Sequence, residues 1–120
     1  VMMVTVNGDV HDIGKTIVGA MLTANGMNLI DLGADIPNEE VVEAVLREKP
    51  DVLGLSALLT STMEEQGKII KMLEERNLRD KVKVIVGGAP VTESWAKTIG
   101  ADGYADSAVT AVNLVRDLFN

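Results

Sequence analysis

The residues best suited to chemistry lie in one short stretch, residues 8–16, which reads GDVHDIGKT. It holds the only histidine of the chain, His11, between two aspartates and two glycines. An imidazole can move protons near neutral pH or donate a ring nitrogen to a metal. Asp9, two residues earlier, can accept the other ring N–H and so set the tautomer and basicity of the ring. A local role is also open, in which Asp9 forms an Asx turn and the histidine only shapes the loop.

The spacing argues against a metal ion held by protein ligands alone. Zinc needs three or four protein ligands, and the neighbours of His11 offer only carboxylates. The chain has no cysteine, so it has neither disulfides nor thiolate sites. A metal carried in a macrocycle brings most of its own ligands, and it would need only the one nitrogen that His11 can supply.

Three other uses of such a loop fit the sequence poorly. A phosphate-binding loop that ends in Gly14-Lys15-Thr16 requires glycine where Asp9 stands. A receiver domain requires a phosphoacceptor aspartate at the end of the third strand, where Ser56 stands. A flavodoxin requires a hydroxyl-rich first loop and aromatic side chains around the flavin, and both are missing.

The elements that must position these residues follow from the apolar pattern. Short apolar runs alternate with amphipathic segments, which indicates a parallel sheet covered by helices. Strands are predicted at residues 1–6, 27–32, 51–56, 82–86 and 103–105. Helices are predicted at residues 14–25, from the cap at 38 until Pro50 stops the helix, from 62 onward, at 92–99 and at 107–119. Right-handed crossovers then favour an α/β fold with a flavodoxin-like (Rossmann-like), doubly wound, five-stranded parallel sheet of order 2-1-3-4-5.

Local signals predict how two of these helices begin. Asn38 is the predicted N-cap of the second helix, with two glutamates in its first turn. Thr62 is the predicted N-cap of the third helix, in a capping box over residues 62–65. The predicted buried stripe of the second helix is Val42, Val45 and Leu46.

In a sheet of this kind, ligands bind beyond the carboxyl ends of the strands. The segments predicted to lie there are residues 7–13, 57–62, 87–91 and 104–107. The unusual residues fall on the same edge: His11, Ser56, Thr60, Thr62, Gly87 and Gly88. The glycine pair also suits an ordinary turn, and a helix-capping role for Thr62 does not exclude a second role at a site. The convergence favours a ligand site at this edge.

Composition narrows the class of protein. A chain of 120 residues suits one domain, and its net charge of -7 argues against nucleic acid as a partner. Its only aromatic residues are Trp95, Tyr104 and Phe119, so the core must be aliphatic. No apolar run reaches the roughly 20 residues that span a bilayer, and no signal peptide is visible; we expect no membrane partner and a cytoplasmic location. Val1 already lies in the first predicted strand, so we expect a fragment of a longer protein.

Three motifs together resemble those of a known family. The motifs are Asp9-x-His11-x-x-Gly14, Ser56-x-Leu58 and Gly87-Gly88. In order and spacing they are similar to the cobalamin (B12)-binding domains of corrinoid proteins and methionine synthases, and the resemblance covers nearly the whole chain. Ile13 and Lys15 make the fuller stretch look most like the methyltransferase branch of the family.

The resemblance implies roles for individual residues. His11 would replace the base of the cofactor as the lower axial ligand of cobalt, and Asp9 would hydrogen-bond the other ring nitrogen. Thr62, where related methionine synthases carry serine, would continue this ligand relay. The implied contacts of the displaced nucleotide tail are Ser56, Leu58 and Thr60. The remaining implied cofactor contacts are Gly8, Val10, Asp12, Ile13, Gly14, Gly87, Gly88 and Ala89.

The resemblance also implies a function. The cofactor would be cobalamin or a related corrinoid, with methylcobalamin as the loaded state. The implied partners are a methyltransferase specific for the methyl donor and an acceptor methyltransferase. In the family a helical cap shields the corrin; none is found here, so residues 1–120 are expected to be a cobalamin-binding domain that acts as a carrier module.

Three alternatives stay open. The chain could be the B12-binding fragment of a methionine synthase, or part of a B12-dependent sensor or regulator. Outside the family, a phosphate- or nucleotide-binding signalling module remains.

Overall fold

Five parallel strands form one sheet in the computed structural model, which describes residues 1–118. The strands are β1 (Met2–Thr5), β2 (Ile30–Asp31), β3 (Val52–Ser56), β4 (Lys83–Gly87) and β5 (Gly103–Ala105). Their order across the sheet is β2-β1-β3-β4-β5, which confirms the predicted flavodoxin-like topology. The predicted second strand is longer than β2, because only two residues of β2 pair in register with β1 at the sheet edge.

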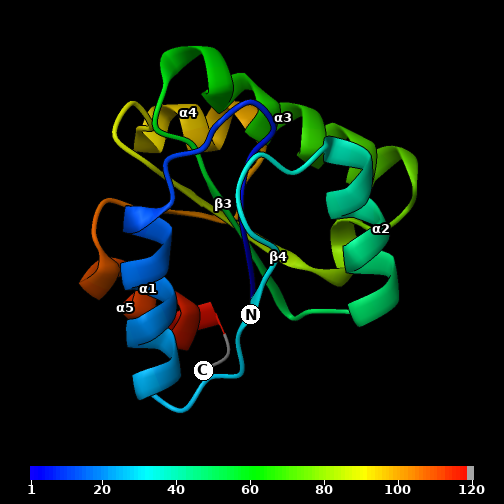
Figure 1. The fold of residues 1–120 in the computed structure, drawn as a ribbon. Helices are drawn as coiled ribbons and strands as arrows, with labels where there is room; N and C mark the ends of the chain where they lie inside the picture. The colour runs from blue at the N-terminus through cyan, green and yellow to red at the C-terminus, as the bar shows by residue number, and fades with distance from the viewer. Residues whose placement is uncertain (119–120) are drawn as a thin grey trace.

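Helices cover both faces of the sheet (Figure 1). On one face, α1 (Ile13–Ala24) and α5 (Ala108–Leu118) pack against each other. On the other face lie α2 (Asn38–Glu48), α3 (Thr60–Glu75) and α4 (Glu93–Ile99), and a 3₁₀ turn at Arg79–Lys81 precedes β4. The prediction that the last helix reaches Phe119 falls outside the described residues. None of the helices within residues 1–118 is long and apolar enough to cross a membrane.

Each face of the sheet has its own aliphatic cluster. Successive residues of a strand point to opposite faces, so Met2 and Val4 join the larger cluster under α2 and α3. Met3 joins the smaller cluster under α1 and α5. All four residues of β1 are buried, as expected for a strand covered on both sides.

The predicted start and buried stripe of α2 are partly wrong. Asn38 is the first residue of the helix and Pro37 occupies the cap position, where no side chain makes a capping bond. The Asn38 amide instead donates to Glu65 of α3 at 2.7 Å, so a tertiary contact takes the group that local reasoning assigned to the cap. Leu46 is 44% exposed, and Val41 contributes to the buried stripe in its place.

The predicted capping role of Thr62 is also wrong in its position. Helix α3 begins at Thr60, so Thr62 is its third residue, and the extended Leu59 occupies the cap position. The Thr62 hydroxyl accepts the Leu59 N–H at 3.3 Å. Thr62 therefore caps the helix from inside its first turn. From this position its hydroxyl reaches Asp9 in the loop that follows β1.

The turn after β4 depends on the absence of a side chain at Gly88. The residue has a φ of +126°, a backbone conformation that favours glycine. A Cβ atom there would collide with the carbonyl oxygen of Ala57 in the loop after β3. The loops after β3 and β4 can therefore lie this close together only because residue 88 is glycine.

We expect Gly88→Ala to lower the free energy of unfolding by about 3 kcal/mol, because backbone strain and overpacking act together. Gly14→Ala is the matched control. A Cβ at Gly14, in the first turn of α1, would meet no atom within 4 Å, so we expect a gain of about 0.5 kcal/mol. Urea unfolding measures both values. Equal stability of the Gly88 variant and the parent would contradict the steric explanation.

Candidate functional site

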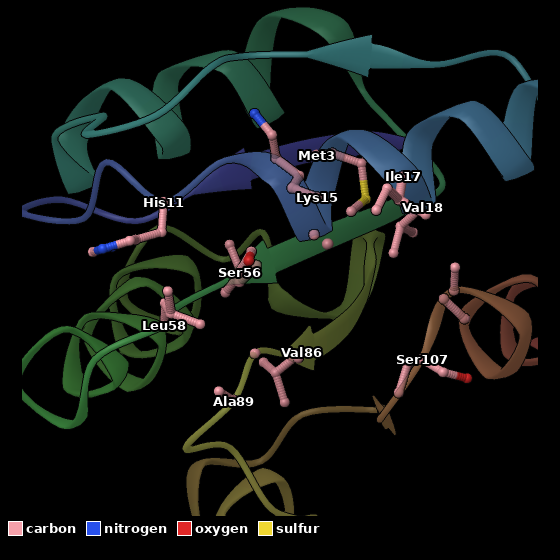
Figure 2. A pocket seen from close by; sticks show the side chains of 18 of the residues that line it. Met3, His11, Lys15, Ile17, Val18, Ser56, Leu58, Val86, Ala89 and Ser107 are labelled. Atoms are coloured by element: carbon pink, nitrogen blue, oxygen red, sulfur yellow. The ribbon is translucent and has the colours of Figure 1, made fainter.

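A cavity of about 760 Å³ opens at the carboxyl edge of the sheet, on the face covered by α1 and α5 (Figure 2). Its wall comes from the loop after β1, the ends of β3, β4 and β5, and the facing sides of the two helices. The helices contribute mainly apolar or small side chains, among them Ile17, Val18 and Ala111. The arrangement suits a ligand with a large apolar surface and few polar contacts.

The structure brings most of the predicted cofactor contacts to this cavity. Those that line it are Val10, His11, Asp12, Ile13, Gly14, Ser56, Leu58, Gly87, Gly88 and Ala89. In Figure 2, His11 and Leu58 lie at the same end of the cavity and come from different loops. Residues from three loops that are distant in the sequence therefore border one space.

Four of the predicted site residues do not line the cavity: Gly8, Asp9, Thr60 and Thr62. Thr60 is an exposed residue at the start of α3. Gly8 is exposed as well, with a φ of +84°, and its N–H donates to Asp35 at 2.7 Å. Asp9 and Thr62 are buried behind His11, so they act on any ligand in the cavity only through other residues.

The Asp9 carboxylate is completely buried and accepts four hydrogen bonds. One oxygen, Oδ2, accepts from the Thr62 hydroxyl at 2.6 Å and from the Leu58 N–H at 2.7 Å. The other, Oδ1, lies 2.9 Å from the backbone nitrogen of His11 and 2.8 Å from its ring Nδ1. The first of these Oδ1 contacts is the Asx turn allowed by the sequence. Asp9 therefore shapes the loop and also contacts the ring of His11.

The hydrogen bonds keep Asp9 ionised. Burial by itself would raise the pKa of this carboxyl, but the donors from Thr62, Leu58 and His11 outweigh burial and hold the pKa well below its ordinary value. An ionised carboxylate can only accept, so the ring Nδ1 must be the donor in its contact with Asp9.

His11 consequently presents its other ring nitrogen. With Nδ1 protonated, the neutral ring has its lone pair on Nε2, and the side chain is 45% exposed. Within residues 1–118, no group of three or more histidine, cysteine or acidic side chains is arranged to hold a metal ion. A single nitrogen is thus what this loop offers to a metal.

Comparison with known protein families identifies the family of this chain. The B12 binding domain family matches residues 1–113. The chain belongs to this family. The resemblance seen in the three motifs is therefore confirmed, and so is cobalamin or a related corrinoid as the cofactor.

Individual relatives agree with this assignment. The chain is 49% identical over 114 residues to a dimethylamine corrinoid protein of Methanosarcina barkeri, covering 95% of this chain and 54% of that protein. The solved monomethylamine corrinoid protein of the same organism has a TM-score of 0.91 at 41% identity, covering 98% of this chain and 57% of the other. A methanol:cobalamin methyltransferase complex, also from M. barkeri, has a TM-score of 0.89 at 39% identity, covering 98% and 45%. This B12-binding domain spans about half the length of these proteins.

The residues present fit a corrinoid. A volume near 760 Å³ lies within the range of about 300–1,000 Å³ that is usual for sites of small molecules and cofactors. Gly14 leaves open space beside the cavity, since a Cβ there would meet nothing within 4 Å. Nε2 of His11, which has no partner among the described residues 1–118, suits a metal whose other ligands come from a macrocycle.

Sequence reasoning missed part of the cavity wall. Tyr104 lines it from β5, and Asp106 and Ser107 line it from the residues just after that strand; the sequence predicts this segment at the correct edge but assigns it no role. Ile17 and Ala111 line it from α1 and α5, and no motif in the sequence marks them as site residues. The helical periodicity marks such residues as inward-facing, but it cannot tell a filled interior from a cavity.

A second missed feature is the surroundings of Asp12. The Lys15 ammonium contacts this carboxylate at 2.7 Å and, together with a hydrogen bond of 3.0 Å from Thr5, lowers the pKa of Asp12 despite partial burial. The sequence gives Lys15 a meaning only through the resemblance to the methyltransferase branch. No recognisable signal in the sequence marks a lysine in the first turn of a helix as buried.

We expect the Asp9→Asn variant to lose less unfolding free energy than the parent as the pH is lowered. The folded-state pKa of Asp9 is lower than the unfolded value of about 3.9, so its ionised form stabilises the fold above that value and the benefit is lost as the pH falls. At pH 7 the variant should lose about 1–3 kcal/mol of unfolding free energy, because an amide cannot accept all four hydrogen bonds. Between pH 5 and pH 3 its stability should fall less than that of the parent, which denaturant titrations at each pH would measure.

Asp80→Asn is the control for net charge, because Asp80 is exposed on the 3₁₀ turn. It should change the unfolding free energy by no more than about 0.5 kcal/mol at pH 7. Identical acid sensitivity of Asp9→Asn and the parent would contradict the hydrogen-bonded carboxylate as the source.

Proposed function

We propose that this domain carries a methyl group on a corrinoid, with His11 as the lower axial ligand of cobalt. The observation that carries the proposal is the orientation of the ring. Asp9 holds Nδ1, and Nε2 of the half-exposed imidazole has no hydrogen-bond partner within residues 1–118, at the end of a large apolar cavity. When bound, the corrinoid supplies a cobalt centre that accepts a methyl group from a donor and passes it to an acceptor.

The side chains behind His11 would tune its strength as a ligand. The ionised Asp9 accepts the hydrogen bond from Nδ1 and so fixes the tautomer and the direction of the ring. Thr62 donates to the same carboxylate at 2.6 Å, and it thereby draws charge away from the oxygen pair. A proton added to the Asp9–His11 pair would weaken the ligand, so this relay would couple cobalt ligation to protonation.

The cavity would hold the displaced nucleotide tail of the corrinoid. Ser56 at the end of β3 and the glycine pair at the end of β4 line it from the sheet, and the small helical residues leave it open. Exposed apolar side chains at the rim, among them Val10 and Ile13 at 69% and 78% exposure, would lie against the macrocycle. Burial of these side chains by a flat apolar ligand would favour binding.

The partners in this proposal are a donor-specific methyltransferase and an acceptor methyltransferase. The resemblance to the methanol:cobalamin methyltransferase complex, at 39% identity, supports the first of these. The resemblance to a dimethylamine corrinoid protein, at 49% identity, favours a methyl-carrier system over a methionine synthase or a sensor.

We expect His11→Ala to abolish the spectrum of histidine-ligated cobalt. The full chain would be mixed with hydroxocobalamin and desalted, and its absorption spectrum recorded beside those of His11→Ala and Asn7→Ala. Asn7 is an exposed residue of the same loop that does not line the cavity, so its replacement should leave the spectrum as in the parent. Retained corrin with a spectrum unaffected by His11→Ala would overturn the ligand assignment.

We expect Gly14→Leu to reduce the affinity for cobalamin about tenfold, which corresponds to about 1.4 kcal/mol. The larger side chain would occupy space at the cavity, where the nucleotide tail is proposed to lie. Cobinamide, which lacks that tail, is the matched ligand and should bind the variant and the parent equally. Equal losses for both corrinoids, measured by equilibrium titration, would contradict a tail-binding role for the cavity.

A further inference from the structure

Lys15 is a buried lysine whose charge the proposed function does not use. Its side chain has no exposed surface. The ammonium contacts Asp12 at 2.7 Å, Asp31 at 2.5 Å and the carbonyl oxygen of Gly33 at 3.0 Å. Three acceptors match the three N–H groups of an ammonium, which compensates for the cost of burying its charge.

These contacts join the loop between β1 and α1 (residues 6–12, the histidine loop) to the edge strand β2. Asp12 directly follows His11, and its carboxylate also accepts the Thr5 hydroxyl from the end of β1. Asp31 ends β2, and its carboxylate accepts the Gly33 N–H at 2.9 Å. Lys15 thus connects Asp12, at the end of the histidine loop, to β2. Asp9, earlier in the same loop, contacts the start of α3 instead.

The same edge segment holds the loop at a second point. The Asp35 carboxylate accepts the Gly8 N–H at 2.7 Å, and the Asp35 N–H donates to the carbonyl oxygen of Asp9 at 2.9 Å. Residues 31–35 therefore contact the loop directly before His11 and, through Lys15, are joined to Asp12 after it. Two contacts on one short loop restrict the direction in which the ring is presented.

Removal of the ammonium would have two effects on this arrangement. Asp12 would lose its contact with β2, and the carboxylates of Asp12 and Asp31, which now share one nitrogen, would repel each other. Both effects would shift the residue next to His11.

We infer that Lys15 is a positioning residue for the cobalt ligand: by joining Asp12 to Asp31 and Gly33, it holds the His11 loop in the orientation that presents Nε2. This inference rests on the proposed role of His11. Asp31 provides an independent probe, because it does not line the cavity, and within residues 1–118 its carboxylate is hydrogen-bonded only to the Lys15 ammonium and the Gly33 N–H.

The test compares Lys15→Met with Lys68→Met, the same change at an exposed lysine of α3. In the cofactor-free full chain, Lys15→Met should speed amide hydrogen exchange at His11 about tenfold, because the loop opens more often. With hydroxocobalamin bound, it should lower the equilibrium constant for His11 ligation about tenfold, read from the histidine-dependent absorption change. Lys68→Met should match the parent in both measurements.

Asp31→Asn should lower the same constant by a smaller factor. The double variant with Lys15→Met should lower it no further than Lys15→Met alone, because the two residues act through one contact. An unchanged constant in Lys15→Met, or additive effects in the double variant, would overturn the inference. If Lys15→Met does not fold, Asp31→Asn decides: a lowered constant supports the positioning role, and the parental value overturns it.

His11→Ala, run in the same series, separates the two proposals. A parental spectrum in His11→Ala would overturn the ligand assignment and, with it, the role of Lys15. A changed spectrum in His11→Ala together with parental behaviour of Lys15→Met would overturn only the positioning role.

Discussion

The buried carboxylate of Asp9 is the constraint on which the site depends. An ionised group without exposed surface is costly unless several donors surround it, and Asp9 has four. Two of them belong to the loop after β3 and the first turn of α3. The loop after β1 can keep its charge buried only while these elements are in place. The orientation of the His11 ring is therefore a consequence of how three separate segments pack.

The strand order makes this arrangement possible. In the order β2-β1-β3, the first strand has β2 on one side and β3 on the other, so loops from both neighbours flank the histidine loop. Asp9 uses the β3 side, where it meets Leu58 and Thr62. Lys15 uses the β2 side, where it meets Asp31. An order that placed β1 at the sheet edge would leave one of these buried charges without partners.

The two faces of the sheet have different tasks. Under α2, α3 and α4 lies the larger aliphatic cluster, which is filled by side chains from the strands and helices. Under α1 and α5 the cluster is smaller, and the carboxyl end of that face is a cavity because glycine and alanine occupy helical positions that face it. The face under α2, α3 and α4 is thus tightly packed, whereas the face under α1 and α5 contains the cavity. The contact between the Gly88 turn and Ala57 joins the ends of β4 and β3 at the mouth of this cavity.

Local sequence patterns are enough to predict the class of fold, the edge of the sheet that carries the site, and the family, because apolar periodicity and short motifs are properties of neighbouring residues. Tertiary structure alone decided what depends on contacts between distant residues. Asn38 bonds across to Glu65 instead of capping its own helix, and Thr62 moves inside the first turn of α3 and meets Asp9, 53 residues away. The partners of Lys15 on β2 and the cavity between α1 and α5 arise in the same way. Burial and charge pairing override local preference at these positions, since an unpaired buried charge costs more than an imperfect helix cap.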